Sequence, residues 1–200
     1  MKNILLFGFI TLLIVSCIPK NKEKLIKNQE TNYADTVLFK DSIYLFFENL
    51  SDSTYRLIWG NNELKNTSID TIHVFPNGKL NLEYFNSKAI IVRQGCGSSC
   101  FFAYVLPIFQ NVKEKLYMYP LAFDTTNNLI AYGNDKNDLL LTIENYISYK
   151  KMNINEDFLK GPFSGFCIDS IFFQSNGLFI KWKNSDDELV TKLFDIKELK

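Results

Sequence analysis

The sequence contains few of the residues from which most catalytic and metal sites are built. Its 200 residues include one histidine and four cysteines, and its 22 basic residues are balanced by 22 acidic ones. A formal net charge of zero argues against nucleic acid as a partner, because such binding needs a basic surface. Glycine and proline are also scarce, at nine and five residues, so the composition is not that of a disordered or collagen-like chain.

Hydrophobic and aromatic residues are plentiful by contrast. They make up 46% and 15% of the chain, and the 18 Phe and 10 Tyr supply ample material for a buried core. A chain of this length and composition is typical of one globular domain.

The pattern after residue 35 predicts a mainly β fold. Short apolar runs alternate with clusters of Asn, Asp, Ser and Gly about every ten residues, a spacing typical of sandwiches and barrels. In residues 79–84, polar and apolar side chains alternate strictly, and Tyr55, Leu57 and Trp59 fall on one face of another strand. We therefore expect residues 36–200 to form a single antiparallel β-sandwich or barrel-like domain of many short strands.

Two further hairpins are predicted from their turn residues. One joins residues 116–123 to 129–132, and the other joins residues 166–173 to 178–182. No internal repeat of fixed period accompanies them, so the sequence does not support a solenoid.

The C-terminal segment fits either a helix or a strand. Residues 185–188 match a capping box, after which Leu189 and Ile196 would lie on one helical face. On a strand, Val190 and Phe194 would share a face instead. The polar character of the preceding loop and the β character of the domain favour the strand, with one C-terminal helix as the alternative.

The N-terminus has the features of a secretion signal. Lys2 precedes an apolar run over residues 4–15 that one glycine and one threonine interrupt. As a helix this run would span about 18 Å against about 30 Å of bilayer hydrocarbon, so it is short for a membrane-spanning helix. A small residue, Ser16, ends the run and is followed by Cys17.

Residues 14–17, Ile-Val-Ser-Cys, resemble the lipobox of bacterial lipoprotein precursors. The resemblance covers residues 1–17 and implies that residues 1–16 are a signal peptide removed before Cys17. The cysteine would then carry two acyl chains through its sulfur and a third on its amino group, which together anchor a protein stably. Ile18, in place of the aspartate that often marks inner-membrane retention in that family, favours the outer membrane. An uncleaved signal anchor and a soluble secreted protein are the alternatives.

The segment after the lipobox is polar and lysine-rich. We expect residues 17–35 to form a lipid-anchored flexible tether, because little in them could be buried. The location that the resemblance implies is the bacterial cell envelope, on the periplasmic face of the outer membrane. The membrane would then be one partner of the protein, reached through the N-terminal lipid.

Three cysteines lie in the predicted β domain: Cys96, Cys100 and Cys167. If residues 90–93 and 101–106 pair as a hairpin, Cys96 and Cys100 end the two strands across a short loop. Directly opposed residues of an antiparallel pair have Cα atoms about 4.5–5.5 Å apart, which a disulfide accepts. Exported proteins meet an oxidising compartment, so we predict a disulfide between Cys96 and Cys100. A bridge from either residue to Cys167 is the competing prediction.

A redox role for the same two thiols is a sharper hypothesis, since closely spaced cysteines can exchange disulfides. Thioredoxin-like enzymes, however, carry a two-residue spacing at a helix N-terminus. The spacing here is three residues and the surroundings are β. The pattern therefore favours a structural disulfide.

No metal, cofactor or catalytic residue is predicted. Three thiols and the distant His73 lack the paired spacing of zinc sites. Acidic loops at residues 134–138 and 186–188 offer oxygen ligands for Ca²⁺, but Asn and Asp are also the usual residues of turns. His73 lies in a predicted strand and is interpreted as a structural or surface residue.

Aromatic residues suggest where a partner would bind. Tyr55, Trp59, Tyr117 and Tyr119 could form a sugar-stacking platform, but alternation explains the first two as core. Phe101 and Phe102 are adjacent, so a strand cannot bury both on one face. We predict a contact loop that consists of Gly97, Ser98, Ser99, Phe101 and Phe102.

Together these features favour a membrane-anchored envelope lipoprotein with a non-enzymatic β-rich binding domain. Its partner would be an envelope protein or a glycan. The alternative is an envelope thiol-disulfide redox protein that uses Cys96 and Cys100.

Overall fold

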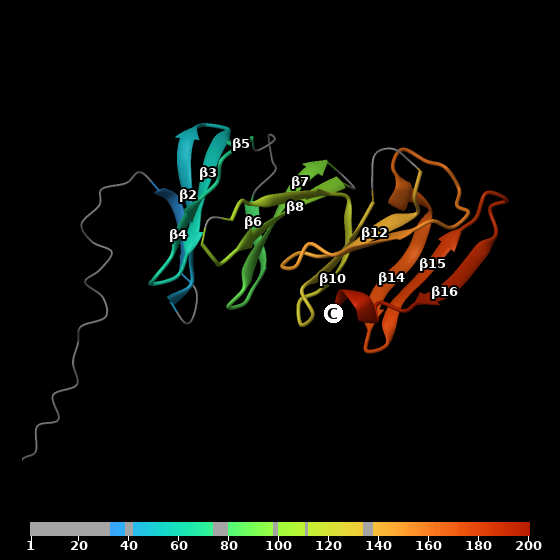
Figure 1. The fold of residues 1–200 in the computed structure, drawn as a ribbon. Helices are drawn as coiled ribbons and strands as arrows, with labels where there is room; N and C mark the ends of the chain where they lie inside the picture. The colour runs from blue at the N-terminus through green and yellow to red at the C-terminus, as the bar shows by residue number, and fades with distance from the viewer. Residues whose placement is uncertain (1–32, 39–41, 74–79, 98–99, 111, 134–137) are drawn as a thin grey trace, which may run out of the picture. The chain divides into compact units, whose positions relative to one another are not determined.

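Figure 1 shows the fold as a computed structural model, which describes residues 33–38, 42–73, 80–97, 100–110, 112–133 and 138–200. The described strands belong to one compact unit, Asn32–Lys200. The predicted signal peptide and most of the predicted tether lie outside the described residues.

The described residues form four antiparallel sheets, each built from a continuous stretch of chain. Sheet A has the order β1-β2-β3-β4 with β5 added to β3, and sheet B has the order β6-β7-β8-β9. Sheet C has the order β10-β11-β12-β13, and sheet D the order β14-β15-β16. The strands of sheets A and B are β1 (Tyr33–Leu38), β2 (Tyr44–Ser51), β3 (Thr54–Gly60), β4 (Lys65–Thr67), β5 (Ile72–His73), β6 (Leu80–Phe85), β7 (Ala89–Gly97), β8 (Cys100–Pro107) and β9 (Lys115–Met118). Those of sheets C and D are β10 (Pro120–Asp124), β11 (Leu129–Tyr132), β12 (Leu141–Asn145), β13 (Lys151–Ile154), β14 (Ile168–Gln174), β15 (Gly177–Lys183) and β16 (Leu189–Phe194).

Turns in sheets A, B and C use the same local device. A side-chain oxygen of Asn or Asp accepts hydrogen bonds from the backbone N–H groups two and three residues later, which makes an Asx turn. Asn61, Asn86, Asp124 and Asn145 each do this, at distances of 2.8–3.1 Å. These polar residues therefore end strands by bonding to their own backbone.

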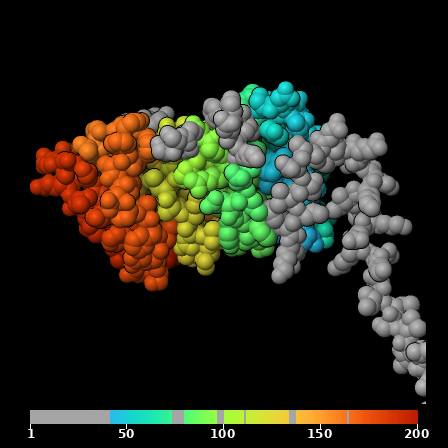
Figure 2. All heavy atoms as spheres, turned by 180° about the vertical axis from the view of Figure 1, so that it is seen from behind, coloured from blue at the N-terminus to red at the C-terminus, as the bar shows by residue number. Residues whose placement is uncertain are grey.

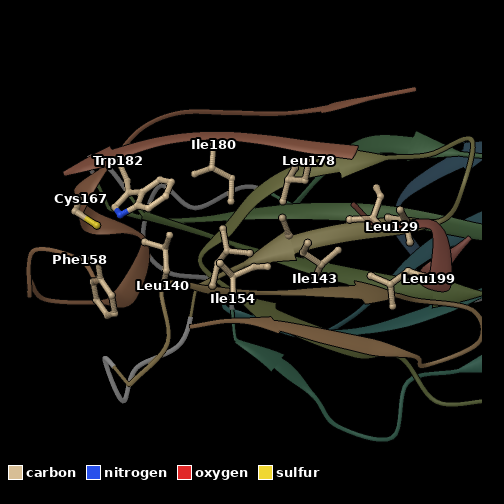
Figure 3. Close-up of a cluster of buried hydrophobic side chains, with 13 residues drawn as sticks. Leu129, Leu140, Ile143, Ile154, Phe158, Cys167, Leu178, Ile180, Trp182 and Leu199 are labelled. Carbon is tan, nitrogen blue, oxygen red and sulfur yellow. The ribbon is translucent and has the colours of Figure 1, made fainter. Parts of the chain in front are cut away.

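Three clusters of buried apolar side chains join the sheets in chain order: A with B, B with C, and C with D. Figure 3 shows the third cluster, in which Leu129 and Ile143 of sheet C lie with Leu178 and Ile180 of sheet D. In the space-filling view of Figure 2, the yellow and orange atoms of sheet C touch those of sheet D. Each core is thus made by two consecutive sheets.

Sheets B and C each contribute side chains to a buried core on both of their faces. In β7, Ile90 and Val92 belong to the cluster with sheet A, whereas Ala89 and Ile91 belong to the cluster with sheet C. Because successive side chains of a strand point to opposite faces, a strand covered on both sides has an unbroken apolar run. The run Ala89 to Val92 is therefore the sequence signature of an inner sheet.

The mainly β, antiparallel fold expected from the sequence is confirmed. The strand predicted at residues 79–84 is β6, and the hairpin predicted after residue 166 is β14 with β15. The C-terminal segment is the strand β16, so the helix alternative is wrong; Val190 and Phe194 both pack against the C–D core. Within the described chain the longest helical segment is the 3-10 turn Ser164–Cys167.

The hairpin predicted between residues 116–123 and 129–132 is confirmed for β10 and β11, but residues 116–123 are divided between two sheets. The chain breaks at Tyr119, which has a φ of 51°, a conformation that ends the strand. Lys115–Met118 joins sheet B as β9, and Pro120–Asp124 joins sheet C as β10. Pro120 was the available signal, since proline lacks an N–H and is found at the first residue or the edge of a strand.

Candidate functional site

The predicted contact loop lies at the end of the β7–β8 hairpin. An irregularity between Gly95 and Gly97 shifts the register, so that Gly97, rather than Cys96, pairs with Cys100. Cys96 is disulfide-bonded. The side chain of Cys100 and the residues Ser98 and Ser99 lie outside the described part of the chain, so the Cys96–Cys100 bridge stays a prediction.

Cys167 carries a buried thiol in the core between sheets C and D. In Figure 3 it lies beside Trp182, near the end of the cluster that holds Phe158. Burial raises the pKa of the Cys167 thiol, which lowers the fraction of reactive thiolate. Cys167 takes part in no disulfide in this structure, so the competing bridge from Cys96 or Cys100 to Cys167 is not formed.

Phe101 and Phe102 are both half-buried, on opposite faces of β8. The Arg93 guanidinium lies 3.6 Å from the centre of the Phe101 ring and 3.9 Å from the Glu83 carboxylate. Phe101 is thus partly covered by a cation. Phe102 lies opposite Met118 of the neighbouring strand β9 and opposite Gln94 of β7.

An exposed apolar row continues from Phe102 along β9. Leu116 and Met118 point to the same face as Phe102, and 47% and 41% of their surfaces are exposed. We call Phe102, Leu116 and Met118 the β9 apolar row. The sequence analysis predicts residues 116–123 as one hairpin strand and does not identify this exposed row. Alternation of Leu116 and Met118 with the fully buried Tyr117 was the available signal.

A charged cluster lies on the opposite face of β9, where sheets B and C meet. Its centre is Glu144 of β12, whose side chain is fully buried. The Lys115 ammonium hydrogen-bonds to Glu144 Oε1, and the Tyr132 hydroxyl donates to Oε2 at 3.1 Å. The Lys151 ammonium lies 3.6 Å from Oε2. Two cations and a hydroxyl therefore compensate a carboxylate that burial alone would strongly disfavour.

Tyrosines enclose this cluster, and their ionisation is suppressed. Burial raises the pKa values of Tyr117, Tyr132 and Tyr149, and the negative charge of Glu144 raises them further. All three are neutral at physiological pH. The Lys115 ammonium lies 5.0 Å from the centre of the Tyr117 ring and 5.6 Å from that of the Tyr149 ring, so the rings add cation–π contacts.

The sequence did not single out Glu144. In the sequence, Thr142 and Glu144 alternate with Leu141 and Ile143. This pattern is typical of a strand whose polar face is exposed to solvent. The structure confirms the opposite faces, but sheet B covers the second one and all five residues of β12 are buried. Only packing between sheets reveals this site.

His73 is an exposed residue of the two-residue strand β5, as the sequence interpretation expected. Its Nδ1 lies 3.5 Å from the Thr54 hydroxyl, and its backbone oxygen accepts a hydrogen bond of 2.6 Å from the buried side chain of Gln94. These contacts make His73 part of the attachment of β5 to sheets A and B.

The four aromatic residues that could form a sugar-stacking platform, Tyr55, Trp59, Tyr117 and Tyr119, do not lie together. Trp59 is buried in the A–B core with Tyr55 packed against it, whereas Tyr117 is buried between sheets B and C. Tyr119 stacks on Phe163 with ring centres 4.3 Å apart. The core interpretation is confirmed for Trp59, and Tyr55 is partly buried against the same core.

The acidic loops also behave as turns where they are described. In the β15–β16 turn, Asp187 pairs with Lys183 at 2.7 Å, and the Glu188 carboxylate accepts a hydrogen bond from Asn184 at 3.3 Å. Residues 134–137 lie outside the described residues. Across the described ranges, no three His, Cys, Asp or Glu side chains gather as a metal site would require.

No protein-family model matches the chain, and no curated protein or solved structure matches it either. In the part of the chain that the structure describes, no helix has both the length and the apolar character needed to cross a membrane.

Proposed function

We propose that the protein is a lipid-anchored component of the bacterial cell envelope, attached through Cys17 to the periplasmic face of the outer membrane. Its β domain acts as a non-enzymatic binding module for another envelope protein. The lipobox resemblance at residues 14–17 supports the anchor. The single observation that carries the binding function is the β9 apolar row next to the predicted contact loop.

The β9 apolar row suits a protein partner better than a glycan. Leu116 and Met118 supply flexible aliphatic surface, and methionine is enriched in protein interfaces. The row is also held firmly, because β8 pairs along its length with β7 and also with β9. Exposed apolar surface on such a rigid support is typical of an interaction site.

Photo-crosslinking from position 118 tests the binding function. With benzoylphenylalanine in place of Met118 in the native cell, we expect a covalent adduct of one discrete mass that protease removes, because the row would contact a protein. Leu116→Asp in the same chain should reduce the adduct several-fold, since a charge in an apolar interface must be desolvated. The measurement is adduct yield on a denaturing gel.

The matched control uses Leu189 of sheet D, which is 56% exposed and lies on a different sheet. Benzoylphenylalanine at position 189 should give no adduct of that mass, and Leu189→Asp should leave the Met118 adduct unchanged. Equal yields from both positions would show non-specific contact and contradict the proposal. An adduct that resists protease but is cleaved by a muramidase would overturn the protein partner in favour of a glycan.

Intact mass of the protein from its own membrane fraction tests the anchor and the redox alternative together. We expect a chain that begins at Cys17 and carries three acyl groups. In the folded protein, alkylation should be slow, because Cys96 is disulfide-bonded and burial raises the pKa of Cys167. Denaturation should expose one alkylatable thiol, and reduction should add Cys96 and Cys100.

The outcome separates the two functions. A rapidly alkylated pair or a mixed disulfide in the folded protein would contradict the structural bridge and support thiol-disulfide exchange by Cys96 and Cys100. An unlipidated chain would contradict the anchor. Alkylation of Cys167 should become faster as the pH rises towards its raised pKa and level off above it, because the thiolate is the reacting form.

A further inference from the structure

Two ammonium groups share one carboxylate at the boundary of sheets B and C. Lys115 comes from β9 of sheet B and Lys151 from β13 of sheet C, and both form ion pairs with Glu144. Glu144 neutralises one of these positive charges. The second positive charge has no counterpart within the cluster.

The contacts of Glu144 show that Lys151 is the lysine whose N–H donors Glu144 does not use. Glu144 Oε1 accepts from Lys115, and Oε2 accepts from the Tyr132 hydroxyl at 3.1 Å. Lys151 lies 3.6 Å from Oε2, which is an ion-pair distance but too long for a hydrogen bond. Its three N–H donors are therefore held beside the cluster without being used by Glu144.

The neighbouring residues do not remove the surplus charge. Lys150 is exposed beside Lys151, and residues 146–153 contain no acid. Glu114 precedes Lys115 but points to the other face of the strand, where its Oε1 accepts from the backbone N–H groups of Ile69 and Asp70 at 2.9 and 3.2 Å. Lys115, Lys151 and Glu144 together therefore carry a net positive charge.

The cluster is open to solvent on its cationic side. The side chains of Lys115 and Lys151 are 32% and 49% exposed. Among the described strands, β9 and β13 are the last in their sheets, so the two lysines stand at sheet edges. Tyr149 lies next to them with its ring half-exposed, and its φ of 61° is a strained conformation for a residue other than glycine. Such strain persists where surrounding contacts impose it and is concentrated at functional sites.

We propose that Lys115 and Lys151 form a binding site for an oxyanion group, a carboxylate or a phosphate, with the Tyr149 ring as one wall. The bound group completes a cluster of two cations and two anions. Lys151 donates hydrogen bonds to it, and Lys115, which Glu144 holds in place, adds charge. The buried Glu144 thus positions a cation so that the free protein does not have to order it on binding.

Titration of the full chain in detergent, followed by amide NMR, tests this site. The probes are succinate and inorganic phosphate, added separately at low salt. We expect saturable shifts confined to residues 115, 132, 144 and 149–151, weakened by added sodium chloride because screening reduces attraction between exposed charges. Saturation with succinate alone assigns the site to carboxylates, and with phosphate alone to phosphates; either result supports the oxyanion site.

Lys151→Met is the decisive variant, because Glu144 keeps Lys115 and Tyr132 and the fold is retained. We expect at least about a five-fold loss of affinity, as for a charge-assisted hydrogen bond at a partly exposed site. Lys181→Met is the matched control, since Lys181 forms a comparable partly exposed pair with Asp169 at 3.0 Å on sheet D. It should leave the affinity unchanged.

Three results would overturn the proposal: shifts that stay linear with both probes, shifts spread over many lysines, or equal affinity of the Lys151→Met variant and the unaltered chain. The oxyanion site and the β9 apolar row lie on opposite faces of β9, and the titration uses no protein partner. A negative titration would therefore not contradict the proposed protein-binding function. A negative crosslinking result would likewise not contradict the oxyanion site.

Discussion

Trp59→Ala is expected to lower the free energy of unfolding by about 3–5 kcal/mol, the cost typical of removing a buried tryptophan. The Trp59 side chain is fully buried in the core between sheets A and B. Its indole N–H also donates a hydrogen bond of 2.8 Å to the Pro107 carbonyl at the end of β8. The substitution therefore opens a cavity and removes a link between the sheets. Urea denaturation followed by circular dichroism measures the loss.

Two further variants separate packing from the hydrogen bond. Trp59→Phe keeps an aromatic ring but loses the donor, and we expect a smaller loss of about 1–3 kcal/mol. Leu189→Ala, at an exposed position of sheet D, should change stability by no more than about 0.5 kcal/mol. A loss below about 1 kcal/mol for Trp59→Ala would show that sheets A and B do not share this core.

Lys115→Met should cost about 2–3 kcal/mol, because it removes the closest cation from a fully buried carboxylate. The loss stays below that of a completely unpaired buried charge, since Tyr132 and Lys151 still contact Glu144. Methionine fills nearly the same length of side chain, so the change reports chiefly on charge. The measurement is again the midpoint and slope of urea unfolding.

The double variant Lys115→Met with Glu144→Leu provides the sharper comparison. Replacing both members of a buried pair by apolar residues is often neutral, so we expect the double variant to be more stable than Lys115→Met alone. Lys181→Met, which breaks a partly exposed pair, should cost less than about 1 kcal/mol. If the double variant were the less stable of the two, Glu144 would not be a buried charge that depends on Lys115.

Several strands and turns of this fold could be predicted from the sequence, because interactions between nearby residues produce them. Strict alternation in residues 79–84 became β6, and the Asn and Asp clusters became Asx turns, since these oxygens reach their own backbone. The β14–β15 hairpin followed from its turn residues. In each case the determining atoms lie within a few residues of one another.

The candidate sites could be predicted from the sequence only in part. The contact loop was predicted from its cysteines and adjacent aromatics, whereas the exposure of Leu116 and Met118 depends on where β9 ends. That end is set by the positive φ of Tyr119, which sends the chain from sheet B into sheet C. Alternation alone treats the two sides of a strand as equivalent until another sheet covers one of them.

Apart from the break at Tyr119, the strands and turns could be predicted from neighbouring residues, and the lipobox pattern is itself a run of consecutive residues. The contribution of sheets B and C to a core on each face, and the burial of Glu144 with two lysines, could not be predicted in this way. Whether one face of a strand is buried depends on the sheet that packs against it. Lys115 and Glu144 lie 29 positions apart and meet only when two sheets share a core.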